Sequence, residues 1–258
     1  MPFRQYIRKR DQRGEYWEGQ SFEEHVSLCG LQLTTNLLLE SLPEEGFVLE
    51  AGCGLGRWVV FLRRKGVEVF GLDVSRRTLS EARRHAGDIP LVASDVSVMP
   101  FKDEVFSAVL SFGVVEHLEE MLPVAFREMR RVLKKDGLLF LAVPSLNPIR
   151  RIVVHPYILV RNLVRRMCGV ELVFDECRYS RSEVRNLMVQ NGFEPLRIVP
   201  DDLRLPYAMG LCRDFRRRFG NPEKFELNGL GLFIERVLRK LSPWISCGGV
   251  FCMARREV

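Results

Sequence analysis

The sequence lacks the features that mark membrane-spanning, secreted and zinc-binding proteins. No apolar run approaches the roughly 18–20 residues that a membrane-spanning helix needs, and residues 1–20 hold no apolar stretch like that of a signal peptide. Seven cysteines are present, but none forms a pair with the two-residue spacing typical of zinc sites. We therefore expect a cytoplasmic protein with reduced thiols and no metal ion.

Charge of one sign is not gathered into a long block, although the chain is basic overall. The formal net charge is +6, from 39 lysines and arginines against 33 acidic residues. A solvated basic surface explains this pattern, and so does attraction to anionic lipid headgroups or to an acidic substrate. Because no nucleic-acid-binding motif accompanies the charge, we expect no nucleic-acid partner. The sequence leaves the oligomeric state open.

Three glycines at alternate positions, Gly52, Gly54 and Gly56, follow a short apolar run that contains Glu50. Glycine lets the backbone approach a ligand closely because it has no side chain and tolerates a positive φ. The helix expected after the loop turns free N–H groups and a positive dipole end toward the same place, which suits the carboxylate of an amino-acid-like ligand. The dinucleotide fingerprint of dehydrogenases needs a glycine where Arg57 stands, so the spacing disfavours that class.

Short apolar strands alternate with helices from residue 47 to residue 143. Such alternation predicts a parallel sheet with right-handed crossovers, in which ligands bind beyond the carboxyl ends of the strands. A capping box at Ser21 and Glu24 begins an earlier helix, expected over 21–41. The strands expected in the whole chain are 47–51, 67–72, 91–93, 105–111, 138–143, 193–199 and 249–254. The other helices are expected at 56–65, 75–86, 118–135, 179–191 and near 232–241.

Four motifs together resemble those of the class I S-adenosylmethionine-dependent methyltransferases, in the broad small-molecule group that includes the ubiquinone-pathway enzymes. The motifs are residues 50–56 (EAGCGLG), 71–75 (GLDVS), 94–96 (SDV) with 99–101 (MPF), and 105–111 (VFSAVLS) with 116–118 (EHL). The resemblance covers about residues 45–145. It implies an α/β fold with a Rossmann-like seven-stranded sheet of order 3-2-1-4-5-7-6, whose last strand is antiparallel, with helices on both faces and a cap insertion.

The length of 258 residues fits one domain with a full core. We divide it into an N-terminal arm and helix at 1–45, of which 1–20 is expected to be irregular, and a cofactor-binding core at 46–143. Residues 144–177 and 200–246 interrupt the alternation with two long stretches. Loops of that length are usually functional, so we interpret both as a cap over the acceptor pocket.

The resemblance implies S-adenosylmethionine as cofactor and S-adenosylhomocysteine as its product. Asp73 ends the second strand, where an acid can accept hydrogen bonds from both ribose hydroxyls; otherwise it is a strand-end acid or helix cap. Asp95 is placed to accept from the adenine amino group, with the Val96 N–H donating to the ring, unless it only shapes a turn. Glu50 supports the loop, and because a buried carboxylate without partners is costly, we expect it to be hydrogen-bonded. The predicted cofactor set is Glu50, Gly52, Cys53, Gly54, Gly56, Asp73, Val74, Asp95, Val96, Ser111 and Phe112.

Glu116 and His117 form the ionisable pair nearest to the position that the motifs imply for the methyl group. His117 can act as a general base near neutral pH, or it can serve as a structural or pocket-lining residue. The transfer needs little acid–base machinery, because the sulfonium donor is already activated and correct positioning of the acceptor supplies much of the rate.

From these features we expect an enzyme that transfers a methyl group from S-adenosylmethionine to a small-molecule or lipid-like acceptor, most often at oxygen, in an enclosed pocket. The alternatives are methylation of nitrogen or carbon on another metabolite or a macromolecule, a nucleoside-binding dehydrogenase, and a cofactor-binding fold without activity. Residues 150–161 are apolar in the middle and basic at both ends, which predicts either a cap helix packed on the sheet or an interfacial patch. The second interpretation makes the protein a cytoplasmic enzyme with peripheral contact to an anionic membrane.

Overall fold

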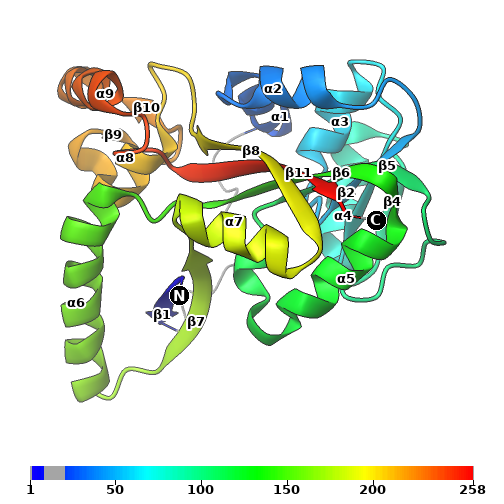
Figure 1. Ribbon diagram of the computed structural model, residues 1–258. Helices are drawn as coiled ribbons and strands as arrows, with labels where there is room; N and C mark the ends of the chain where they lie inside the picture. Colours follow the sequence, from blue (N-terminus) through cyan, green and yellow to red (C-terminus); the bar gives the residue numbers. More distant parts are fainter. Residues whose placement is uncertain (1, 9–20, 258) are drawn as a thin grey trace.

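A seven-stranded sheet forms the centre of the computed structural model, which describes residues 2–8 and 21–257 (Figure 1). The strands lie side by side in the order β4-β3-β2-β5-β6-β11-β8. Numbered along the chain within this sheet, the order is 3-2-1-4-5-7-6, as expected. β11 runs antiparallel to both of its neighbours, whereas the other neighbouring pairs are parallel. The strand bounds are β2 Phe47–Ala51, β3 Val69–Asp73, β4 Leu91–Ala93, β5 Phe106–Phe112, β6 Leu133–Pro144, β8 Phe193–Asp201 and β11 Gly249–Arg256.

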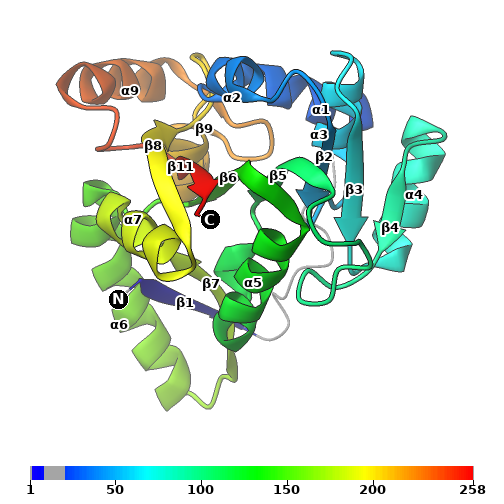
Figure 2. The same ribbon diagram turned by 45° about the vertical axis from the view of Figure 1, so that its right-hand side comes forward.

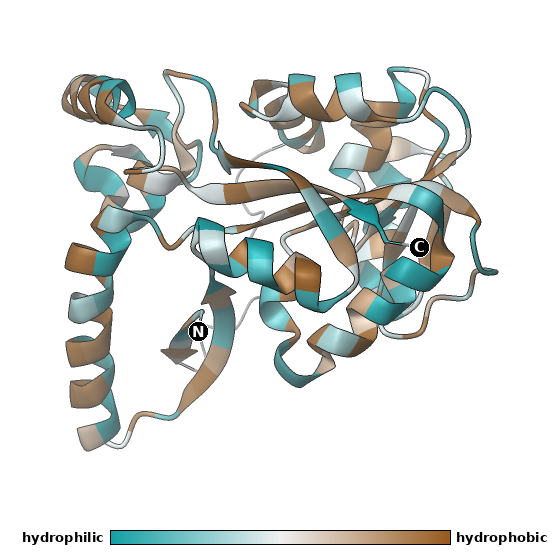
Figure 3. Cartoon of the chain, viewed as in Figure 1, coloured by the Kyte–Doolittle hydropathy of each residue, from teal (hydrophilic) through white to brown (hydrophobic). Residues whose placement is uncertain are grey.

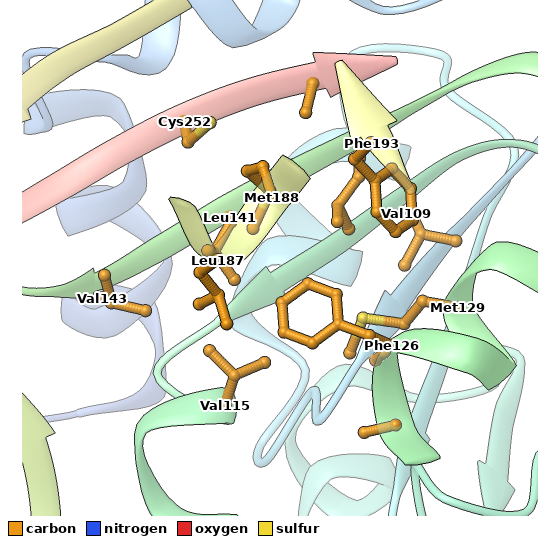
Figure 4. Packing of buried hydrophobic residues seen from close by; sticks show 14 of the residues in the cluster. Val109, Val115, Phe126, Met129, Leu141, Val143, Leu187, Met188, Phe193 and Cys252 are labelled. Carbon is orange, nitrogen blue, oxygen red and sulfur yellow. The ribbon is translucent and has the colours of Figure 1, made fainter. Parts of the chain in front are cut away.

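Helices cover both faces of the sheet, because neighbouring residues along each strand point to opposite sides and both sides are apolar. Val109 of β5 packs on one side with Phe126 and Phe193 (Figure 4). The next residue, Leu110, packs on the other side with Trp58. The first side is covered by α5 Leu122–Val132 and α7 Arg181–Gln190, and the second by α1 Phe22–Leu31, α3 Arg57–Arg63 and α4 Arg76–Ala86.

The helix expected over 21–41 is divided into α1 and α2 (Thr35–Ser41), although the expected capping box is present at its start. The break arises because Gln32 adopts extended backbone angles, φ −66° and ψ 142°, and forms a β-bridge with Leu203. Thr34 Oγ1 then donates a hydrogen bond to Asp201 Oδ1 at 2.7 Å. The break therefore ties the N-terminal helices to the end of β8.

The N-terminal arm is not irregular over residues 3–8, contrary to the sequence-based expectation. These residues form β1 (Phe3–Arg8), which pairs antiparallel with β7 (Leu172–Arg178) in a separate two-stranded sheet (Figures 1 and 2). Gln5 Nε2 donates to Asp175 Oδ2 across this sheet, and the two residues are 170 positions apart. A local pattern could not reveal the pairing, because the partner strand lies so far along the chain. The expected arm at 9–20 lies outside the described residues.

The helix expected over 118–135 is shorter, because two 3-10 turns precede it and a strand follows at once. The turns span Val115–His117 and Glu119–Met121, α5 begins at Leu122, and β6 begins at Leu133. His117 therefore lies in a tight turn soon after β5.

Residues 144–177 and 200–246 contain more regular structure than expected, and the helices of both segments lie at the left in Figure 1. A small apolar cluster around Leu211 and Leu227 holds the second segment together. Within 2–8 and 21–257, no helix combines the length and apolar character that crossing a membrane requires. The elements are a π-helical turn at Arg150–Val154, α6 His155–Met167, β7, α8 Met209–Phe215, a 3-10 turn at Arg216–Arg218, β9 Gly220–Asn221, β10 Glu226–Leu227 and α9 Gly229–Leu241.

Candidate functional site

The predicted cofactor residues come together at the carboxyl edge of the sheet. Glu50 lies near the end of β2, Asp73 is the last residue of β3, and Phe112 ends β5. Asp95 lies two positions after the last residue of β4. Since these strands are parallel, their ends lie on one edge, where open α/β sheets bind ligands.

The glycine loop between β2 and α3 has left-handed backbone angles that residues with a side chain rarely adopt. The φ angle is +87° at Gly52, +53° at Gly54 and +75° at Gly56. A Cβ atom at Gly52 would also lie 2.2 Å from Cγ2 of Val114, so this position has no room for a side chain. A Cβ atom at Gly54 would meet no atom of the described residues within 4 Å. The loop therefore packs tightly at its start and faces open space at Gly54.

The Asp73 carboxylate connects β3 to the glycine loop. Its Oδ2 accepts a hydrogen bond from the Gly54 N–H at 2.9 Å, and its Oδ1 accepts one from the Ser75 N–H at 2.9 Å. A carboxylate offers about four acceptor positions, so these two bonds leave capacity for a ligand. The side chain thus shapes the loop and can still accept hydrogen bonds from hydroxyl groups.

Asp95 is exposed, whereas the other predicted cofactor residues near it are partly at the surface and partly in the core. Oδ1 of Asp95 accepts from the Ser97 N–H at 2.8 Å and from the Ser97 hydroxyl at 2.6 Å, which shapes the turn after β4. Val74 is exposed, whereas the side chains of Val96 and Cys53 are buried in the core. Val96 and Cys53 therefore offer a ligand their backbone rather than their side chains.

Burial raises the pKa of Glu50 to about 8, and the nearby positive charge of Arg57 opposes this rise. The carboxyl group accepts a hydrogen bond from the Val59 backbone. Its Oε2 is buried and has no hydrogen-bond partner among the residues that the structure describes. The expectation of a hydrogen-bonded Glu50 thus holds for one oxygen, and at neutral pH the side chain is largely protonated.

Ser111 also has a buried oxygen whose partner is missing from the described part of the chain. It lies next to Leu110, which is opposite Glu50 in the sheet, so the two orphaned oxygens are on adjacent strands. A buried polar atom without a partner calls for an explanation, and a bound ligand or water supplies one. Phe112 is half-buried and contacts Trp58 edge-on, with the ring centroids 5.3 Å apart.

The ring of His117 is oriented by strand β7. Its Nδ1 lies 2.5 Å from the backbone carbonyl oxygen of Asp175, and because a carbonyl can only accept, Nδ1 carries the proton. In the neutral ring Nε2 therefore holds the lone pair. This atom lies 4.0 Å from Oε1 of the buried Glu116.

The sequence analysis missed a group of buried charged residues at the same edge, which includes Arg150, Arg178 and Asp201. Burial raises the pKa of Asp201 to about 7. The sequence places Arg150 at the basic end of an apolar segment, but the side chain is fully buried and pairs with Asp214, 64 positions away. No local pattern signals such a pair.

The fold is that of an open α/β sheet, a class in which ligands bind at the carboxyl ends of the parallel strands. Comparison with known proteins identifies the central part of the chain. Residues 49–141 match the model of a family described as a methyltransferase domain. The matched residues form a methyltransferase domain of the class I S-adenosylmethionine-dependent kind, an enzyme domain whose cofactor is S-adenosylmethionine.

The individual relatives are distant. The malonyl-acyl-carrier protein O-methyltransferase of Hamiltonella defensa is 25% identical over 196 residues, which cover 73% of this chain and 71% of that protein. In four other curated relatives the matched part spans 44–65% of the relative's length. A Methanosarcina mazei S-adenosylmethionine-dependent methyltransferase has a TM-score of 0.60 at 16% identity, over 86% of this chain and 97% of that one. The Streptomyces coelicolor geranyl diphosphate C-methyltransferase, solved with S-adenosylhomocysteine, has a TM-score of 0.56 at 21% identity, over 86% and 77%.

Proposed function

We propose that this protein transfers a methyl group from S-adenosylmethionine to an oxygen atom of a lipid-like acceptor, working in contact with an anionic membrane. The observation that carries the transfer to oxygen is the orientation of His117, whose Nε2 is the proton-accepting atom of the ring. Several relatives are named O-methyltransferases, which supports oxygen as the acceptor atom. The exposed apolar surface of α6 supports the lipid-like acceptor.

The residues at the carboxyl edge fit the cofactor. When bound, S-adenosylmethionine supplies a methyl group on a positively charged sulfonium, which is an activated leaving group. The remaining acceptor positions of Asp73 suit the two ribose hydroxyls, and the open space at Gly54 lets the backbone approach. Asp95 would accept from the adenine amino group, and the Val96 N–H would donate to the ring. The buried Oε2 of Glu50 would gain its missing partner from the methionine portion.

His117 would act as the general base. A hydroxyl acceptor must lose its proton as the new bond to carbon forms, and Nε2 can take that proton because Nδ1 already donates to the Asp175 carbonyl. The carboxylate of Glu116, with Oε1 at 4.0 Å from Nε2, would stabilise the resulting imidazolium. Methylation of nitrogen or carbon on another metabolite or a macromolecule, and a fold that binds cofactor without activity, are the competing outcomes.

The π-helical turn and α6 carry an exposed apolar surface. Figure 3 shows apolar residues along α6, which stands away from the central sheet. The side chains on this surface are 53–79% exposed, and the exposed Arg151 and Arg166 lie beside them. An exposed apolar helix bordered by arginines matches the pattern of helices that lie in the interface of anionic membranes. The apolar side chains are Ile152, Val153, Tyr157, Leu159, Val160, Leu163, Val164 and Met167.

Isotope transfer tests the proposal. The purified protein is incubated with S-adenosylmethionine that carries a deuterated methyl group, together with the organic or the aqueous fraction of a cell extract. A product of the organic fraction with the label on oxygen, located by tandem mass spectrometry, is the expected result. Label on nitrogen or carbon, or label confined to water-soluble products, contradicts the proposed acceptor. Binding of S-adenosylhomocysteine without labelling in any fraction contradicts catalysis itself.

A further inference from the structure

Arg150 is a fully buried arginine with one unused donor. Its Nε donates to both oxygens of Asp214, at 2.9 and 2.7 Å, and its Nη1 donates to the carbonyls of Ser145 and Gly248, at 2.8 and 2.9 Å. Its Nη2 is buried without a hydrogen-bond partner among the described residues. Ser145 follows β6 and Gly248 precedes β11, so the guanidinium lies at the carboxyl edge of the sheet.

Arg178, the last residue of β7, repeats this arrangement. Its Nη2 pairs with Glu176 Oε1 at 2.7 Å, and its Nε donates to Gln5 Oε1 at 3.2 Å. Its Nη1 is buried and likewise has no partner within the described chain. Arg178 lies directly opposite Phe3 in the β1–β7 sheet.

His155 supplies a third buried nitrogen of the same kind. Its ring stacks on Phe3, with the centroids 3.5 Å apart and the planes 8° from parallel. Its Nε2 is buried and has no hydrogen-bond partner in the part of the chain that the structure describes. Burial, together with the positive charges of Arg178 and Arg150, lowers the pKa of His155 to about 3. Burial and the charge of Arg150 also lower the pKa of Arg178, to about 10. The three side chains therefore share one buried region.

Within the described chain, the acceptor atoms of this region do not satisfy all of its buried nitrogens. The carboxylates of Asp214 and Glu176 balance the two guanidinium charges, yet one nitrogen of each arginine and one imidazole nitrogen have no hydrogen-bond partner among the residues described. A buried donor without an acceptor destabilises the fold, and the cost is larger when the donor is charged. Two such arginine donors beside one buried imidazole nitrogen call for an explanation, and a ligand that carries acceptor atoms supplies it. Of the three side chains, His155 lines a cavity of about 610 Å³, together with Phe3, Leu146 and Ser180.

We propose that Arg150, Arg178 and His155 bind an oxyanion, phosphate or carboxylate, that belongs to the methyl acceptor. This inference rests on the proposed function and names the acceptor class more closely: a lipid-like molecule with an anionic group. β7 connects the two ends of the acceptor site, because the Asp175 carbonyl orients His117 and Arg178 follows three positions later. An anion held by the arginines would fix how far the rest of the acceptor extends toward His117. The arginines are positioning residues in this scheme.

Three small anions serve as probes: pyrophosphate, inorganic phosphate and acetate. The full chain, with ¹⁵N-labelled histidine, is titrated with each probe near pH 6 and followed by NMR. His155→Gln assigns the resonance among the four histidines. A bound anion should raise the pKa of His155 from about 3 and shift its Nε2 signal toward the protonated form. A stronger response to the phosphates assigns a phosphoryl group to the acceptor, and a stronger response to acetate assigns a carboxylate.

Variants make the test decisive. Arg178→Lys keeps the charge but loses the fork of donors, and it should weaken binding of the probe about tenfold or more. Arg84→Gln, on the exposed side of α4, removes one positive charge far from the cluster and should leave affinity unchanged. Arg150→Lys should weaken binding of the probe in the same way. If this variant does not fold, the comparison of the wild type with Arg178→Lys still tests whether the arginines bind the oxyanion.

Two results would overturn the inference: no shift of His155 with any probe, or equal affinity in the wild type and Arg178→Lys. Calorimetry with S-adenosylhomocysteine on the same samples separates this failure from that of the proposed function. Cofactor product that binds while no oxyanion does leaves methyl transfer intact and removes the oxyanion site. Oxyanion binding without any affinity for S-adenosylhomocysteine leaves the oxyanion site intact and contradicts the proposed methyl transfer.

Discussion

His117 Nδ1 donates a hydrogen bond to the backbone carbonyl of Asp175 at 2.5 Å, and this bond joins the turn after β5 to strand β7. It selects the ring tautomer that leaves a lone pair on Nε2. Since β7 is paired with β1, the orientation of the candidate base depends on residues at the N-terminal end of the described chain.

Replacing His117 by glutamine should lower the turnover number by about 10²-fold or more, because a positioned general base contributes roughly 10²–10⁴-fold. The affinity for S-adenosylhomocysteine, measured by calorimetry, should change little, since the cofactor set does not include this side chain. His85→Gln, an exposed histidine on α4, is the matched control. An unchanged turnover number in His117→Gln would leave the residue as a structural part of the pocket.

Asp73→Asn should weaken binding of S-adenosylhomocysteine about tenfold or more, because hydrogen bonds to a charged group contribute roughly 1.5–3 kcal/mol. Asparagine keeps one acceptor oxygen, so the Gly54 N–H retains a partner. Isothermal titration calorimetry gives the affinity, and Asp88→Asn at an exposed position of the next loop controls for the lost charge. Equal affinities for both variants and the wild type would refute a ribose contact at Asp73.

Glu50 should make folding stability depend on pH. Its pKa of about 8 in the native state, against 4.5 for the ordinary group, means that the native protein keeps a proton that the unfolded chain has lost. Stability from this group therefore falls as pH rises from about 4.5 to about 8. Glu50→Gln removes the effect. From pH 5 to pH 9, the free energy of unfolding of Glu50→Gln should rise by on the order of a few kcal/mol relative to that of the wild type.

Urea unfolding at both pH values measures this gain in the free energy of unfolding. Glu68→Gln, at an exposed position before β3, should show no comparable gain. Glu50→Gln and the wild type could instead differ in free energy of unfolding by the same amount at pH 5 and at pH 9. That result would mean that burial does not perturb the pKa of the Glu50 carboxyl group.

Leu163→Asp should reduce binding to vesicles that contain anionic lipid, because it places a charge in the middle of the exposed apolar surface of α6. Vesicle flotation measures the bound fraction, which should also fall with added salt since the arginines contribute. Val189→Asp makes the same change at an exposed valine on α7 and should bind like the wild type. Absence of wild-type binding to anionic vesicles would remove the membrane from the proposal.

The sequence was sufficient to predict the central sheet and the placement of the candidate cofactor residues at one edge of it, because both depend on local signals. Gly52, Gly54 and Gly56 indicate the loop because glycine adopts the positive φ angles that it requires. Asp73 and Asp95 come at or after the ends of strands that are recognisable from short apolar runs. Strand order followed from the family resemblance, and the pairing of β11 between β6 and β8 confirms it.

The acceptor side could not be derived in this way, because its geometry depends on contacts between distant segments. β1 is a strand only through its pairing with β7, and Arg150 resembles a surface residue until Asp214 is brought beside it. The break at Gln32 likewise needs Leu203 as its bridge partner. Periodicity and motif spacing carry no information on such pairs.

β11 occupies the interior of the sheet, between β6 and β8, although it is the last of the seven strands to leave the ribosome. During translation β6 and β8 therefore have unpaired edges until β11 is made, and unpaired edges readily pair with strands of other molecules. A nonsense codon or a proteolytic cut ahead of residue 249 would split the sheet rather than trim it. Truncated products of this gene should thus accumulate as insoluble aggregates and not as smaller working proteins.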